Sequence, residues 1–134
     1  MKHIRAIFTL GFWLYIATLI FLCLYSFKDT GVELPGLLWG IETDKYIHFL
    51  MFFPFSFASW FAFGKNLEYK YHYKIFIYIL LFGLILSTGL EFSQRLTDYR
   101  DFDLFDLLAN YLGLLSGLIL IFSITKLKKF RKHF

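Results

Sequence analysis

Charged residues are scarce in this sequence of 134 residues: only 18% are Asp, Glu, Lys or Arg, against about 25% in soluble domains. Hydrophobic residues make up 58%, and the mean hydropathy is +0.59. A globule of this size leaves much of its surface exposed, so it could not bury that many apolar side chains in water. The composition therefore predicts a membrane protein. It excludes a soluble enzyme, a secreted disulfide scaffold and a disordered tail.

Cysteine is nearly absent, and the common catalytic motifs are missing. Cys23 is the only cysteine, so no intramolecular disulfide can form, and its place in an apolar run suits an inert buried thiol. The sequence contains no His-Glu-x-x-His helix, no Gly-x-Ser-x-Gly elbow and no glycine-rich phosphate loop. No charged side chain lies near the middle of an apolar run, which disfavours a proton-coupled transporter.

Four apolar runs have about the length that crosses roughly 30 Å of hydrocarbon. They cover residues 7–27, 46–63, 75–90 and 107–125. The first run is longer than the core of a signal peptide and no small-residue cleavage site follows it, so we expect it to be retained. Runs of this kind cross membranes as helices, which predicts an all-α bundle of four transmembrane helices. The connecting segments are too short for a second domain, so residues 1–134 are expected to form a single transmembrane domain.

The basic residues predict the orientation in the membrane. Ten of the fourteen Lys and Arg residues lie in the N-terminal segment, the loop between the second and third runs, and the C-terminal tail, where Glu68 is the only acid. The other two loops hold four bases and nine acids. Because Lys and Arg favour the cytoplasmic side, both termini are expected to be cytoplasmic. We interpret the basic tail as a topology determinant that attracts anionic lipid, and expect no nucleic-acid partner.

Polar residues are grouped at the ends of three of the four runs. They are Asp44, Lys45 and His48 at the start of the second run, Glu91 and Gln94 at the end of the third, and Arg100, Asp103, Asp106 and Asn110 at the start of the fourth, followed by Gly113 and Gly117. Spacings of three and four residues place the members of each group on one helical face. In the predicted orientation all three ends lie at the extracytoplasmic side, so the groups are expected to form one polar site there.

The three groups resemble the sequence blocks of the VanZ-like membrane proteins. The blocks are Asp-Lys-x-x-His-Phe at residues 44–49, Glu-x-x-Gln at 91–94, and Arg-x-x-Asp-x-x-Asp-x-x-x-Asn-x-x-Gly-x-x-x-Gly at 100–117. The resemblance implies a small integral protein of the bacterial cytoplasmic membrane with a role in the cell envelope. The founding member of that family is associated with resistance to the glycopeptide teicoplanin. The resemblance supplies no established reaction, and antibiotic resistance remains a family association.

The polar site has a functional interpretation as a place that binds or acts on a lipid-linked or cell-wall-related amphiphile. Crowded carboxylates near a histidine suit acid–base chemistry, and the candidate catalytic residues are Asp44, His48, Glu91, Asp103 and Asp106. The candidate ligand-binding residues are Lys45, Gln94, Arg100 and Asn110. Lys45 and Arg100 would engage an anionic group. A divalent metal is an alternative occupant, and its candidate ligands are His48, Glu91, Asp103 and Asp106.

A structural interpretation of the same residues stays open. Asp103 and Asp106 also fit the first turn of a helix, where carboxylates are favoured by the helix dipole. Ion pairs and hydrogen bonds among the polar residues could clamp the helix ends without any ligand. Gly113 and Gly117 form a small-x-x-x-small pair, which is typical of helix packing. The sequence leaves open whether the protein is an enzyme.

Overall fold

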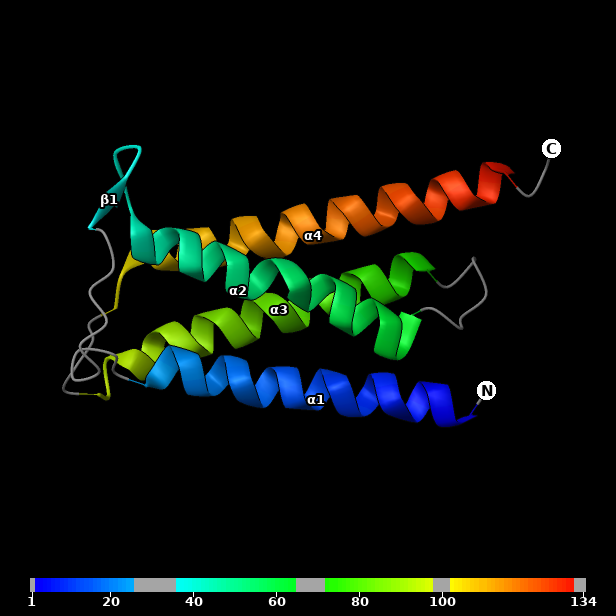
Figure 1. Cartoon of the computed structure of the whole chain (residues 1–134), viewed down its shortest axis with the longest axis horizontal. Coiled ribbons are helices and arrows are strands. Elements are labelled where there is room, and N and C mark those ends of the chain that lie inside the picture. The colour runs from blue at the N-terminus through cyan, green and yellow to red at the C-terminus, as the bar shows by residue number, and fades with distance from the viewer. Residues whose placement is uncertain (1, 26–35, 65–71, 98–101, 132–134) are drawn as a thin grey trace.

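The computed structural model describes residues 2–25, 36–64, 72–97 and 102–131 (Figure 1). In chain order the elements are α1 (Lys2–Leu24), β1 (Leu37–Leu38), β2 (Ile41–Glu42), α2 (Thr43–Ser59), the π-helical η2 (Trp60–Gly64), α3 (His72–Gln94) and α4 (Leu104–Arg131). Four helical segments are long and apolar enough to cross a membrane, which confirms the prediction of an all-α, multi-pass membrane protein.

The helices differ from the predicted runs mainly at their ends. The helix α1 ends at Leu24, and the last two residues of the predicted run, 26 and 27, lie outside the described residues. The helices α2 and α4 begin three residues earlier than predicted, at Thr43 and Leu104. Hydropathy detects only the apolar stretch, whereas helical hydrogen bonding continues into the polar residues that flank it. As a result, Asp44 and Lys45 belong to the first turn of α2.

The short hairpin before α2 was not predicted. Its strands pair antiparallel, with Leu37 opposite Glu42, and the turn residues Trp39 and Gly40 both have positive φ, of 49° and 80°. Two central residues with positive φ are typical of the tight turns that match the twist of a hairpin. The hairpin ends at Glu42, and α2 starts at the next residue, Thr43.

The closest packing in the bundle is between α2 and α4, which lie side by side (Figure 1). A Cβ added to Gly113 would lie 2.3 Å from the carbonyl oxygen of Phe49, and one added to Gly117 would lie 2.5 Å from that of Phe53. The hydroxyl of Ser56 donates to the carbonyl oxygen of Leu114, at 2.9 Å. The two glycines therefore allow the backbones of α2 and α4 to touch.

The helices α1 and α3 complete the bundle through apolar contacts. The helix α1 packs against α3 and against the continuous α2–η2 segment. Phe12, Leu19, Phe52, Phe55 and Leu114 are almost fully buried in the resulting core. The outward faces of the helices remain apolar, as expected for surfaces that contact lipid.

Candidate functional site

The start of α2, the end of α3 and the start of α4 meet at one end of the bundle, on the side of the hairpin (Figure 1). We refer to the polar residues of these three helix ends as the polar cluster: Lys45, His48, Glu91, Gln94, Asp103, Asp106 and Asn110. Contacts join all of them except Gln94 to one another, and Gln94 lies about one turn after Glu91 on α3. The antiparallel order of the helices brings together residues that are separated by about sixty positions in the sequence. Asp44 lies at the edge of this cluster, and Arg100 lies outside the described residues.

Lys45 is the cation at the centre of the cluster. Its Nζ lies 2.6 Å from Oδ2 of Asp103 and 2.9 Å from Oδ1 of Asp106, both of which belong to the start of α4. It also lies 2.7 Å from Oε2 of Glu42 and 3.3 Å from Oδ2 of Asp44. Its side chain is only 14% exposed, so water screens these contacts weakly. Lys45 therefore ties the first turn of α2 to the start of α4.

Asp106 links Lys45 to two buried side chains, His48 and Asn110. Oδ2 of Asp106 lies 3.3 Å from Nε2 of His48, and Nδ1 of His48 lies 3.1 Å from Oδ1 of Asn110. His48, Asp106 and Asn110 are all buried. The carboxylate oxygen and the amide oxygen each lie within contact distance of one ring nitrogen. Both nitrogens of His48 are therefore engaged by protein groups.

Asp103 caps α4 and joins it to α3. Its Oδ1 accepts the backbone N–H of Phe105 at 2.7 Å, as an N-cap side chain does, and its own N–H donates to Oε1 of Glu91 at 3.1 Å. The hydrogen bond from Lys45 holds the pKa of the Asp103 carboxyl below its usual range. Asp103 therefore both caps α4 and joins neighbouring helices.

Gln94 extends the cluster to α1, a link that the sequence did not indicate. Its Nε2 donates to the carbonyl oxygen of Cys23 at 3.1 Å. Cys23 is in the last turn of α1, where carbonyl groups lack partners within their own helix. Only the packing of α1 against α3 brings this carbonyl to Gln94, so no local sequence pattern could have predicted the contact. Glu42 was also missed, although its i,i+3 spacing to Lys45 was a usable signal.

Two amide atoms in the polar cluster are buried and have no hydrogen-bond partner among the described residues. They are Nδ2 of Asn110, a donor, and Oε1 of Gln94, an acceptor. Both side chains are 1% exposed. A buried polar group without a partner costs free energy, so such atoms are uncommon in folded proteins.

The described part of the chain holds no group of three or more His, Cys, Asp and Glu side chains placed to bind a metal ion. The ammonium group of Lys45 lies between Asp103 and Asp106, where a cation would need to bind them. These two carboxylates therefore already have a counter-ion supplied by the protein.

Comparison with known proteins identifies the family. The chain is 35% identical over 77 residues to an uncharacterized protein of Schizosaccharomyces pombe, an alignment that covers 58% of this chain and 45% of the yeast protein. The chain thus spans about half the length of that relative. No solved structure matches it. Residues 12–126, which include all three polar blocks, match the VanZ/LLP1 family. In agreement with the resemblance of those blocks, the chain belongs to the VanZ/LLP1 family.

Proposed function

We propose that this protein is a cell-envelope membrane protein whose polar cluster binds the headgroup of a lipid-linked or cell-wall-related amphiphile. The observation that carries the proposal is the pair of buried atoms without partners among the described residues, Nδ2 of Asn110 and Oε1 of Gln94. Together they offer one donor and one acceptor at the end of the bundle. A headgroup with hydroxyl or amide groups would satisfy both, and its acyl or prenyl chain would lie along the apolar helices.

In this proposal the charged members of the cluster hold the site and the amides contact the ligand. Lys45, Asp103 and Asp106 fix α2 against α4, and Glu91 fixes α3 against the start of α4. Both ring nitrogens of His48 contact protein atoms, so His48 would have to release Asp106 or Asn110 before it could exchange a proton with a substrate. The geometry accordingly favours binding over acid–base catalysis.

The second candidate function is a helix-end clamp that needs no ligand. It is favoured by the contacts of Lys45 with Asp103 and Asp106, since these two contacts join α2 to the start of α4. A clamp and a binding site predict different results when the free donor of Asn110 is removed without loss of its contact with His48.

Asn110→Asp is the variant that separates the two. The substitution keeps an oxygen for Nδ1 of His48 and replaces the donor Nδ2 by an acceptor. A lost hydrogen bond to a headgroup predicts a decrease of about tenfold in bound amphiphile. The measurement is the amount of amphiphile that co-purifies with the protein in mild detergent, determined by lipid extraction and mass spectrometry.

Thr88→Val is the matched control, because Thr88 joins α3 to α4 outside the cluster through a 2.6 Å contact with the hydroxyl of Tyr111. It should retain its amphiphile. Melting of each delipidated variant in detergent reports the structural role separately. Unchanged amphiphile content in Asn110→Asp, together with a lowered melting temperature, would support the clamp and contradict the binding proposal.

We also propose that the polar cluster faces the extracytoplasmic side, with both termini in the cytoplasm, on the support of the distribution of Lys and Arg. Cysteine substitutions at Trp39 in the hairpin and Tyr73 at the start of α3 test this, because both positions are exposed and native Cys23 is buried. An impermeant maleimide should label position 39 but not position 73 in intact cells. The reverse pattern would place the cluster in the cytoplasm.

The finer parts of the proposal, a bacterial cytoplasmic membrane and a link to glycopeptide susceptibility, are supported by the VanZ-like resemblance alone. The matched relative is a yeast protein whose name states no activity, so it adds no support to either part.

A further inference from the structure

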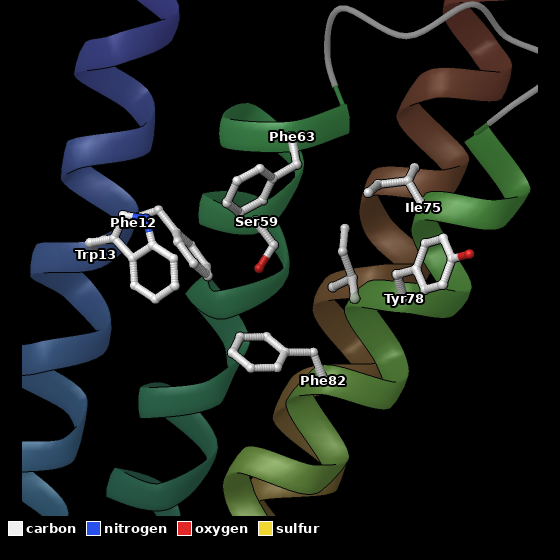
Figure 2. Close-up of a pocket in the computed structure, with 8 residues that line it drawn as sticks. Phe12, Trp13, Ser59, Phe63, Ile75, Tyr78 and Phe82 are labelled. Carbon is white, nitrogen blue, oxygen red and sulfur yellow. The ribbon is translucent and has the colours of Figure 1, made fainter.

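A groove lies between α1 and α3, far from the polar cluster. It has a volume of about 340 Å³, at the lower end of the roughly 300–1,000 Å³ typical of ligand pockets. Its walls are Phe12 and Trp13 of α1, Ser59 of α2, Phe63 of η2, and Ile75, Tyr78, Ile79 and Phe82 of α3 (Figure 2). Ser59 lies about 24 Å along the helix from Thr43, at 1.5 Å per residue, so the groove is near the opposite end of the bundle.

The groove is open because the side chain of Ser59 is small. It is the only small side chain among the lining residues, and it lies between the aromatic rings of Phe63 and Phe82 (Figure 2). Its side chain is 2% exposed, and its hydroxyl has no hydrogen-bond partner among the described residues. A larger residue at position 59 would fill the groove.

Positive charge lies at the same end of the bundle as the groove. Exposed Arg5 is about two turns before Phe12 on α1, and exposed Lys74 directly precedes Ile75 on α3. The starts of α1 and α3 lie at the same end in Figure 1. An apolar groove with two cations at the same end of the bundle matches a molecule with an apolar chain and an anionic headgroup.

We propose that this groove binds one acyl chain of an anionic glycerophospholipid from the surrounding bilayer, with the phosphate near Arg5 and Lys74. The exposed helix faces beside the groove are apolar, so bilayer lipid reaches it directly. The two cations argue against a second copy of the chain, because the copy would bring the same positive charge to the interface. The groove is separate from the polar cluster, so this proposal stands or falls independently of the function proposed above.

The test uses the full chain in phosphatidylcholine vesicles that contain a trace of phosphatidylglycerol with a photoactivatable acyl chain. Cross-links should map to peptides that contain Trp13 and Tyr78. Ser59→Leu should reduce this labelling about tenfold, whereas Ser123→Leu, the same change at an exposed position near the same end of α4, should leave it unchanged. Arg5→Gln with Lys74→Gln should abolish the preference over a photoactivatable phosphatidylcholine.

Smaller changes keep the test decisive if Ser59→Leu does not fold. Ser59→Ala keeps the space and should retain the labelling, and Ser59→Thr and Ser59→Val should reduce it in proportion to the volume added. Equal labelling in the wild type and Ser59→Val would overturn the proposal. So would equal labelling by the two phospholipids in the wild type, or cross-links from the groove to a second copy of the chain.

Discussion

Replacement of Lys45 by methionine is expected to lower the free energy of unfolding by about 3 kcal/mol, the size of effect seen when one partner of a buried ion pair is removed. Methionine keeps the length of the side chain, so the loss comes from the charge. Without the ammonium, Asp106 loses its nearest cation and faces Asp103 across the same space. The carboxylate of Asp106 is only 6% exposed, so water cannot replace the missing charge. Thermal melting of the purified protein in detergent, followed by circular dichroism, measures the effect.

The carboxylates around Lys45 provide graded controls for this prediction. Asp44 is 38% exposed and Glu42 is 60% exposed, so Asp44→Asn and Glu42→Gln should each cost no more than about 1 kcal/mol, as exposed ion pairs do. Asp106→Asn should cost several times more than either, because its carboxylate is buried. If all three substitutions lowered the free energy of unfolding by similar amounts, the burial of each carboxylate would not determine the strength of its contact with Lys45.

The fold was predictable because each helix contains an apolar run that identifies it in the sequence. A run of apolar residues long enough to cross hydrocarbon has few alternatives to a helix, since a membrane offers no water to unpaired backbone groups. The polar ends of the helices carry no such signal, which explains why α2 begins at Thr43 and not at Tyr46. The hairpin was missed for a similar reason. Its two-residue strands are too short to show alternation, and Trp39 is an uncommon residue at positive φ.

The residues of the polar cluster were predictable, whereas most of their partners were not. Because successive helices alternate in direction, the start of α2, the end of α3 and the start of α4 lie at one end of the bundle, as the four apolar runs predict. Lys45 was predicted as a ligand-binding residue, and its contacts with Asp103 and Asp106 were not predicted. Which partner a flexible side chain selects depends on three-dimensional packing, and helical spacing does not contain that information.

The largest packing effect is expected from Gly113→Ala. The new Cβ would lie 2.3 Å from the backbone oxygen of Phe49, which cannot turn aside as a side chain can. The helices α2 and α4 must therefore separate, at a cost near the upper end of the roughly 1–3 kcal/mol typical of overpacking. Phe49 follows His48, and Gly113 lies one turn after Asn110, so the separation should also lengthen the contact between His48 and Asn110. Melting in detergent measures the first effect, and the amount of co-purified amphiphile measures the second.

Two other glycines of the bundle show whether this effect arises from contact between backbones. The Cβ added by Gly117→Ala would lie 2.5 Å from the backbone oxygen of Phe53, but position 117 is one turn farther from the polar cluster. It should destabilise the bundle by a similar amount and change amphiphile content less. Gly89→Ala, in α3, meets nothing within 4 Å and should stabilise the protein by about 0.5–1 kcal/mol, because alanine favours the helix. If Gly113→Ala and Gly89→Ala had the same melting temperature, close backbone contact between α2 and α4 would not be what stabilises the polar cluster.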